Sequence, residues 1–315
     1  MVTTLVNILK TARPRQWVKN LTLYAALIFT GNIYNPQIWV RDFVIVTEAV
    51  LAFTLIATGI YFLNDLIDVE ADRAHPFKKK RPIAAGRISK TGAIAYFAVS
   101  SIVGLWWSSS LSYLFFVVVL GYWIMQVLYS LWLKNFEVVD IFVIALGFFL
   151  RVFAGAIVIN AHLSIWFLLC VISTSLFLAA GKRRAELAIL TEQTAIQHRR
   201  VMGKYSADIL NAYLSMFATA AFLSWALFSF NFYSQTDVPI TATTLTSMSR
   251  TLTINKWLMA TIPVVIFGIM RYLRIVYDGS RAESPERVML SDAPLLTAVL
   301  LWITVVIGVL YWSWL

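Results

Sequence analysis

The stretch Asn64–Asp72 reads NDLIDVEAD and follows an apolar run that begins near Phe43. At helical spacing Asn64, Asp68 and Asp72 lie one above another, and Asp65 shares the adjoining strip. Three carboxylates therefore gather where an apolar helix meets water, and like charges this close repel one another. Bound Mg²⁺ would relieve the repulsion, because it prefers carboxylate oxygens and usually shares them with substrate phosphates. The stretch therefore predicts a metal-bridged diphosphate site.

The composition around this stretch is that of a membrane protein. Hydrophobic residues make up 60% of the chain and charged residues 13%, and the mean hydropathy is +0.75. Long charge-free stretches predict membrane-crossing helices. We expect nine, near residues 20–33, 43–66, 91–108, 113–132, 138–159, 164–181, 209–231, 256–276 and 293–314. The chain is expected to be an all-α integral membrane protein with a single transmembrane domain over 1–315.

The basic residues are distributed unevenly over this topology. Of the 26 Lys and Arg residues, 22 fall on one side, 3 on the other, and Arg151 lies inside the fifth helix. Cytoplasmic loops hold the Lys and Arg excess, so the N-terminus and the long polar loops at 65–90, 182–208 and 271–292 are expected in the cytoplasm. Topology and anionic lipid explain the net charge of +10. We expect a multi-pass cell-membrane protein with a cytoplasmic active site and no nucleic-acid partner.

Cations follow the acidic stretch and recur after the sixth helix. Lys78 and Arg81 could neutralise a departing diphosphate, or they could belong to a positive-inside loop that pairs with its own acids. Lys182 and Glu186 are four residues apart and share a helix face. With Arg183 they form either a second phosphate clamp or an interfacial ion pair, and the sequence leaves both open.

Arg151 is unusual because a guanidinium inside an apolar helix is costly and usually faces the bundle interior or a watery cavity. A structural pair with Asp140 is the alternative, but eleven residues separate the two, about three helical turns. The N-terminal stretch Arg13–Asn20 has two interpretations. It could anchor the chain at the membrane interface. Because Arg suits bidentate phosphate capture, it could instead aim three side chains into a cytoplasmic cavity: Arg15, Lys19 and Asn20.

The spacing Asn64-Asp65-x-x-Asp68-x-x-x-Asp72 in a nine-helix protein resembles the UbiA superfamily of intramembrane prenyltransferases. Four segments together are similar to one branch, the decaprenyl-phosphate phosphoribosyltransferases of cell-wall biosynthesis: Arg13–Asn20, Asp68–Pro76, Arg81–Gly86 and Gly181–Glu186. The resemblance covers most of the chain. It implies a UbiA-like bundle of nine transmembrane helices with a cytoplasmic cap.

One departure bears on the substrate. Typical members of the superfamily carry a second Asp-x-x-x-Asp after the sixth helix, where this chain has Lys182-x-x-x-Glu186. A cation there fits a donor with a 5-phosphate better than a prenyl diphosphate that needs two metals. The resemblance thus implies a Mg²⁺-dependent pentosyltransferase of the membrane, which moves 5-phosphoribose from 5-phosphoribosyl 1-diphosphate to a polyprenyl (decaprenyl) phosphate and releases pyrophosphate.

The resemblance also assigns roles to residues. Mg²⁺ is expected on Asn64, Asp65, Asp68 and Asp72, and the catalytic set is Asp65, Asp68, Asp72 and Lys182. Lys78 and Arg81 would contact the leaving pyrophosphate. The 5-phosphate would lie near Lys182, Arg183 and Glu186. The head of the acceptor lipid would lie near Arg15, Lys19, Asn20 and Arg151.

Two other functions remain open. A prenyltransferase could use the same acidic cluster to activate a prenyl diphosphate for an aromatic or lipid acceptor. A transporter would carry intramembrane charges along a path through several helices, and the predicted helices hold chiefly Glu48 and Arg151. The oligomeric state is also open, with a homo-oligomer among the alternatives.

Overall fold

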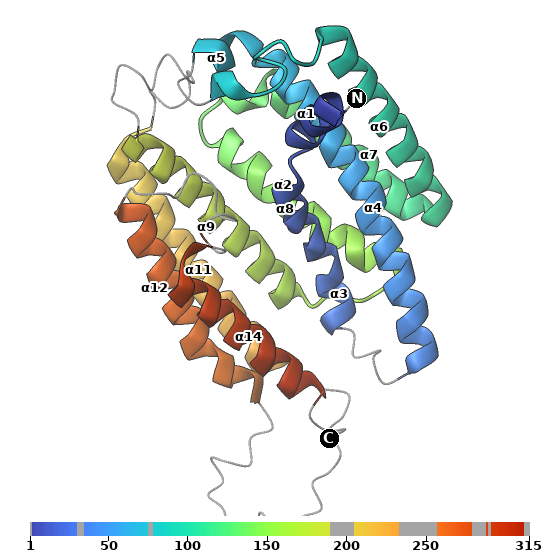
Figure 1. Cartoon of the computed structure of the whole chain (residues 1–315). Helices are drawn as coiled ribbons and strands as arrows, with labels where there is room; N and C mark the ends of the chain where they lie inside the picture. The colour runs from blue at the N-terminus through green and yellow to red at the C-terminus, as the bar shows by residue number, and fades with distance from the viewer. Residues whose placement is uncertain are drawn as a thin grey trace, which may run out of the picture.

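The computed structural model describes residues 2–29, 35–74, 78–189, 205–232, 257–278, 288 and 291–311. Every regular element in these ranges is a helix, which confirms the all-α class, and the long helices lie side by side in one bundle (Figure 1). Eight are long and apolar enough to cross a membrane: α4 (Pro36–Ile67), α6 (Lys90–Leu111), α7 (Tyr113–Leu131), α8 (Val139–Val158), α9 (Ile165–Ile189), α11 (Ala207–Asn231), η7 with α12 (Trp257–Thr261 and Ile262–Tyr277) and α14 (Ala293–Tyr311).

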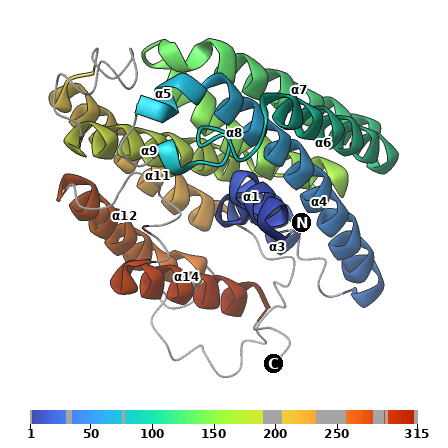
Figure 2. The same cartoon turned by 45° about the horizontal axis from the view of Figure 1, so that its top comes forward.

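The first expected span, near 20–33, differs from the prediction of one continuous helix. The described part of the N-terminal segment is a series of short helices: α1 (Val2–Ala12), α2 (Pro14–Trp17), the 3₁₀ helix η1 (Val18–Leu23) and α3 (Tyr24–Phe29). Arg13 has a positive φ of 53° and Pro14 starts α2, so the chain turns there. Both views show this segment beside α4 (Figures 1 and 2). The expected nine crossings therefore correspond, in the described residues, to eight long helices and one broken segment.

Gly155 explains why the broken segment lies so close to α8. A Cβ atom at this position would collide with the backbone of Leu23, so only glycine allows η1 to approach. Leu23 itself is fully buried, and it packs in a core with Phe53 of α4, Val119 of α7 and Ala154 of α8. This core holds the N-terminal segment in the middle of the first half of the bundle.

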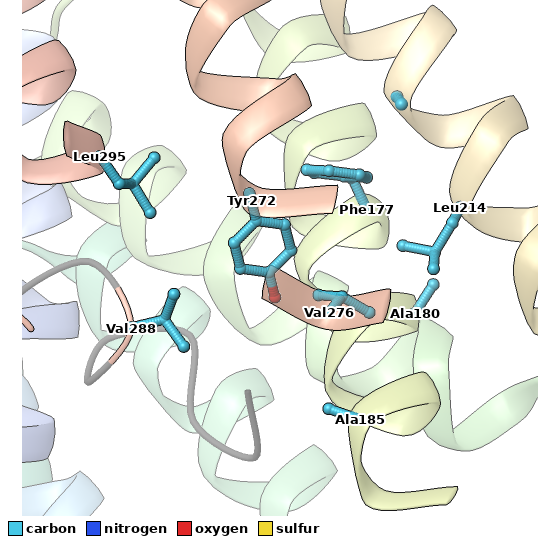
Figure 3. Packing of buried hydrophobic residues seen from close by; sticks show 9 residues of the cluster. Phe177, Ala180, Ala185, Leu214, Tyr272, Val276, Val288 and Leu295 are labelled. Atoms are coloured by element: carbon cyan, nitrogen blue, oxygen red, sulfur yellow. The ribbon is translucent and has the colours of Figure 1, made fainter. Parts of the chain in front are cut away.

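The second half of the bundle has its own core. Tyr272 and Val276 of α12 pack against Phe177 and Ala180 of α9 and Leu214 of α11 (Figure 3). Tyr272 also lies against Gly181, where an added Cβ would come within 2.7 Å of the tyrosine hydroxyl. The close contact fixes the end of α9 that carries Lys182–Glu186, the segment at the position of the second Asp-x-x-x-Asp, which is called the second motif below.

Two helix boundaries differ from the expected ones. α4 begins at Pro36, before the expected 43, because Asn35 caps it by accepting from the N–H groups of Gln37 and Ile38. α9 continues to Ile189, whereas the sequence predicted a loop from 182. Helix-forming residues in Ala185–Ala188 favour this extension, and so does the ion pair between Arg183 and Glu186, three residues apart. The second motif is therefore helical.

A small cap covers the end of α4. It contains α5 (Val69–Ala74), the 3₁₀ helix η3 (Lys78–Lys80) and the turn that follows η3. Val69 and Ile83 of the cap pack with Phe62 of α4 and Ala12 of α1 in one hydrophobic cluster. The cap therefore joins the acidic stretch to the N-terminal segment, as Figure 1 shows for α5 and α1 at the same end of the bundle.

Candidate functional site

The acidic stretch lies at the junction of α4 and α5, and Arg81 of the cap joins two of its carboxylates. Nη1 of Arg81 lies 3.0 Å from Oδ1 of Asp65 and 2.7 Å from Oδ2 of Asp72. Both carboxylates are buried. Asp65 also pairs with Arg13, whose guanidinium stacks over the ring of Tyr61 at 5.2 Å. One guanidinium nitrogen thus occupies the point that Asp65 and Asp72 share.

Asp68 turns to a different cation, Lys134. Nζ of Lys134 lies 2.5 Å from Oδ1 of Asp68, and Nδ2 of Asn64 donates to Oδ2 at 3.2 Å. Lys134 lies in η4 (Leu133–Asn135) and is buried. Our sequence prediction gave it no role in the site. The sequence signal was its position, because this lysine directly follows the charge-free stretch Thr91–Leu133. An ammonium that is buried there needs an acidic partner.

Burial and neighbouring positive charge shift the pKa of Asp72 in opposite directions. Loss of hydration raises the pKa of its carboxyl above the usual value, and the neighbouring Arg81 guanidinium opposes that rise, as does Lys78 more weakly. In the described site, three carboxylates are matched by Arg13, Arg81 and Lys134. The site is therefore electrically balanced, and a bound anion would compete with Asp65, Asp68 and Asp72 for these cations.

The residues fit a divalent cation, although they do not form an all-protein cage. In the described ranges no three His, Cys, Asp or Glu side chains converge on one point, so Asp65, Asp68 and Asp72 do not by themselves enclose a metal ion. Asp65 and Asp72 nevertheless face one position, which a cationic nitrogen occupies. Mg²⁺ typically uses one or two carboxylates and completes its shell with water and substrate phosphate. Two carboxylates facing one cation position match that pattern.

A cavity of about 570 Å³ lies along α1 and α2, and Arg13, which lines it, also pairs with Asp65 of the acidic stretch. Its lining combines the apolar side chains of Val6 and Leu9 with three basic side chains: Lys10, Arg13 and Arg15. The sequence analysis did not predict α1 as a helix. Its signal was the spacing of Leu5, Val6 and Leu9, which places apolar groups on one face, and all three are exposed. Such a face suits contact with lipid.

The second motif is built around a buried arginine. Arg183 is fully buried. Its Nε lies 2.5 Å from Oδ2 of Asp140, its Nη1 lies 2.5 Å from Oε2 of Glu186, and its Nη2 donates to Oη of Tyr129 at 3.0 Å. Nη1 and Nη2 thus make hydrogen bonds, and Nε forms an ion pair with Asp140 that lacks hydrogen-bond geometry. Lys182 is only partly buried at the same end of α9.

Arg151 lies in a separate network deep in the bundle. It donates to Oδ1 of Asn20 at 2.8 Å, to the carbonyl oxygen of Gly147 at 2.6 Å and to Oη of Tyr122 at 2.7 Å. Each of these acceptors is uncharged. Nδ2 of Asn20 donates in turn to Oγ1 of Thr54 at 2.9 Å. The network confirms that Asp140 is not the partner of Arg151, because Asp140 pairs with Arg183.

Two of the residues expected near the head of the acceptor lipid, Asn20 and Arg151, lie far from the acidic stretch along α4. Thr54, which binds Asn20, precedes Asp65 on α4 by eleven residues, about 16 Å along the helix axis. The ammonium of Lys19 lies 5.8 Å from the centre of the Phe148 ring. The same ring lies 5.8 Å from the Arg151 guanidinium. Asn20 and Arg151 contact each other, whereas Arg15 is exposed and lines the cavity along α1 and α2.

The remaining predicted residues lie as follows. Lys78 is exposed in η3, beside Asp72. His75 and Pro76, which complete the expected motif Asp68–Pro76, lie outside the described residues. The structure thus brings together Asn64, Asp65, Asp68, Asp72 and Arg81, adds Arg13 and Lys134, and keeps Arg151 with Asn20 at a separate level.

Comparisons with known proteins identify the family. The chain is 35% identical over 311 residues to decaprenyl-phosphate phosphoribosyltransferase of Mycolicibacterium smegmatis, covering 98% of this chain and 93% of the relative. It is 33% identical to the Corynebacterium glutamicum protein of the same name, covering 97% and 87%. Among solved structures, a UbiA homologue from Archaeoglobus fulgidus bound to GPP and Mg²⁺ superposes with a TM-score of 0.67 at 18% identity, covering 96% of this chain and 99% of the homologue.

The structural likeness shows the fold, and the sequence matches extend over nearly the whole chain. The profile of the UbiA prenyltransferase family covers residues 22–315, which include the acidic stretch and the second motif. Together with the eight membrane-spanning helices, this identifies the chain as a multi-pass membrane protein that belongs to the UbiA prenyltransferase family.

Proposed function

We propose that this protein transfers 5-phosphoribose from 5-phosphoribosyl 1-diphosphate to a polyprenyl phosphate, with the cap and its acidic site facing the cytoplasm. The observation that carries the proposal is the similarity, over 95% or more of the chain, to four proteins named decaprenyl-phosphate phosphoribosyltransferase. The cation at position 182, where an ordinary second Asp motif would begin, supports the same donor.

The reaction exchanges one bond at the ribose C1. A phosphate oxygen of the acceptor lipid forms a bond to C1, and the bond from C1 to the diphosphate oxygen breaks. The electron pair of that bond leaves with the pyrophosphate, and C1 gains oxocarbenium character on the way. A phosphate monoester is already anionic near neutral pH, so the nucleophile needs no strong general base. Positioning and electrostatic stabilisation are then the main contributions of the protein.

The acidic site would bind the diphosphate of the donor. Mg²⁺ held by Asp65 and Asp72, with Asn64 and Asp68 close by, would stabilise the negative charge that develops on the leaving pyrophosphate. Arg81, Arg13 and Lys134 are already paired to these acids. Each can turn from a carboxylate to a diphosphate oxygen, because arginine and lysine both bind phosphate well. Lys78, exposed at the rim, adds a further cation.

The 5-phosphate would lie near the second motif, with Lys182 as its main cation. Our expectation that Arg183 binds the phosphate directly needs revision, because its guanidinium is fully buried between Asp140, Glu186 and Tyr129. Arg183 is better suited to hold Glu186 and the end of α9 in place. In this proposal, Arg183 is a positioning residue and Lys182 is the phosphate ligand.

The acceptor would enter from the bilayer along the cavity beside α1 and α2. Its lipid tail would contact the apolar lining, Val6 and Leu9, and its phosphate would lie near Arg15. Arg151 and Asn20 bind each other about 16 Å below Asp65 along α4. The reacting phosphate must be close to C1, so these two residues shape the floor of the site in this proposal and do not touch the reacting atoms.

The test is incorporation of labelled phosphoribose into polyprenyl phosphate by the purified protein, with Mg²⁺ and with EDTA. We expect Mg²⁺-dependent product that falls by about two orders of magnitude or more in Asp68→Asn, because the carboxylate that holds Lys134 beside the diphosphate site is lost. Asp208→Asn, at an exposed carboxylate near the start of α11, is the matched control and should retain activity. Consumption of a prenyl diphosphate without phosphoribose transfer would instead favour the prenyltransferase alternative.

A further inference from the structure

The short segment between α7 and α8 connects the two motifs. At one end Lys134 pairs with Asp68 of the acidic stretch. At the other end Asp140 pairs with Arg183 of the second motif through Oδ2 and accepts a hydrogen bond from Oη of Tyr205 at 2.7 Å through Oδ1. Six positions along the chain therefore separate a contact to one motif from a contact to the other.

Between these two contacts the backbone is strained. Val138 has φ 66° and ψ −46°, and the N–H of Val139 donates to the carbonyl oxygen of Glu137 at 2.7 Å. This is the classic γ-turn, which is rare and strained, and a β-branched residue is unusual in that conformation. The N–H of Val138 donates to Oη of Tyr205 at 2.7 Å. One hydroxyl group thus holds both the strained residue and Asp140.

Strain of this kind persists only where the surroundings enforce it, and it often marks functional positions. Tyr205 is buried, in a cluster with Ile141, Leu176 and Leu210. Its ring would fill that cluster equally well without the hydroxyl group. The hydroxyl therefore contributes the two hydrogen bonds that fix the turn, and the turn determines where the chain leading back to Lys134 lies.

We infer that Tyr205 is a positioning residue for Lys134: its hydroxyl fixes the γ-turn at Val138 so that the ammonium of Lys134 reaches the acidic stretch and the diphosphate bound there. The inference rests on the proposed function, in which that site binds a diphosphate. Tyr205 does not touch substrate. It acts through Lys134, so removing its hydroxyl should weaken diphosphate binding only while Lys134 is present.

The experiment measures binding of inorganic pyrophosphate with Mg²⁺ to the purified full-length protein by calorimetry. The variants are Tyr205→Phe, Lys134→Met and the double variant. Tyr213→Phe is the matched control, since its ring packs beside the same cluster. Thermal unfolding in detergent is recorded for each variant, so that a folding defect is recognised separately.

We expect Tyr205→Phe to weaken pyrophosphate binding and to slow phosphoribose transfer, each by about ten- to a hundredfold, as a displaced catalytic cation does. Tyr213→Phe should match the wild type. In the Lys134→Met background, adding Tyr205→Phe should change neither quantity, because the two residues act as one unit. The unfolding midpoint of Tyr205→Phe should stay close to that of the wild type.

Three results would overturn the inference: unchanged binding in Tyr205→Phe, an effect that adds in full to that of Lys134→Met, or a loss that only tracks a lowered unfolding midpoint. A wild-type protein that binds Mg²⁺-pyrophosphate but transfers no phosphoribose would overturn the proposed function and leave the binding test of Tyr205 valid. A wild-type protein that binds no pyrophosphate would contradict both.

Discussion

Nε of Arg151 lies 2.8 Å from Oδ1 of Asn20, although the two residues are 131 positions apart in the chain. The bond to Thr54 orients the Asn20 amide, since Nδ2 donates to a hydroxyl and Oδ1 is left to accept. Tyr122 and the ring of Phe53 complete the surroundings of the guanidinium. A cation at membrane depth is thus held by neutral acceptors and aromatic faces that come from η1, α4, α7 and α8.

This network should show energetic coupling. We expect Asn20→Ala and Arg151→Met each to lower the free energy of unfolding in detergent, and the double variant to lose less than the two singles combined. The coupling energy should be about 0.5–2 kcal/mol, the range for hydrogen bonds inside membrane proteins. Thermal unfolding of the four proteins gives the value. Strict additivity would mean that the bond contributes nothing to stability.

The approach of η1 to α8 gives a second prediction. Gly155→Ala should destabilise the protein by about 1–3 kcal/mol, as overpacking does, because the added methyl group would collide with the Leu23 backbone. Activity should fall with it, since Asn20 and Lys19 lie on the displaced segment. Gly121→Ala in α7 is the control, because its Cβ would meet no atom within 4 Å. Equal unfolding midpoints for the two variants would contradict the tight contact.

The sequence predicted the parts of this protein that depend on composition and local spacing. Hydropathy located the long helices, and the spacing of Asn64, Asp68 and Asp72 located the acidic site. Composition and local spacing could not identify ion pairs and hydrogen bonds between residues that are distant in sequence. The pairing of Lys134 with Asp68, 66 positions away, depends on how α7 packs against α4. The broken helix before Phe29 depends on tertiary contacts too, because Leu23 and Asn20 are held by α8.

The contacts of the second motif also depend on packing between helices. The sequence predicted a loop from residue 182, and the family resemblance placed Arg183 near the 5-phosphate. In the structure the helix continues, and one of its cations turns inward to Asp140. Asp140 and Arg183 lie on different helices, so no spacing rule along a single helix could pair them.

Asp292 gives a prediction for acid stability. The hydrogen bond from Arg271 lowers the pKa of the Asp292 carboxyl below its usual value, and the N–H of Leu295 adds to the effect. A depressed folded pKa contributes stability above the unfolded value of about 3.9, and this contribution is lost as the pH falls through the lower folded pKa. Asp292→Asn should therefore lower the unfolding midpoint at pH 7, and the difference from wild type should shrink toward pH 3.

The neighbouring pair provides the control for this experiment. Arg274 and Asp278 lie 3.7 Å apart, and both side chains are exposed. Exposed pairs contribute little to stability, so Asp278→Asn should follow the wild type across the same pH range. If Asp278→Asn showed the same pH-dependent loss as Asp292→Asn, the effect would reflect net charge and not the bond between Arg271 and Asp292.

Replacing Arg81 should strengthen metal binding and weaken diphosphate binding. Its Nη1 occupies the point between Asp65 and Asp72, so in the absence of donor it competes with a divalent cation for the two carboxylates. Arg81→Met should bind Mn²⁺, a spectroscopic substitute for Mg²⁺, about tenfold more tightly, the order of effect that a neighbouring arginine has on a carboxylate. The same variant should bind the diphosphate of the donor more weakly, because a phosphate-binding cation is lost.

Electron paramagnetic resonance of Mn²⁺ measures the metal affinity without pyrophosphate and the binding of pyrophosphate when it is added. Arg87→Met, at an exposed position of the same cap, is the control. A fall in Mn²⁺ affinity without pyrophosphate would show that Arg81 supports the metal site and does not compete for it.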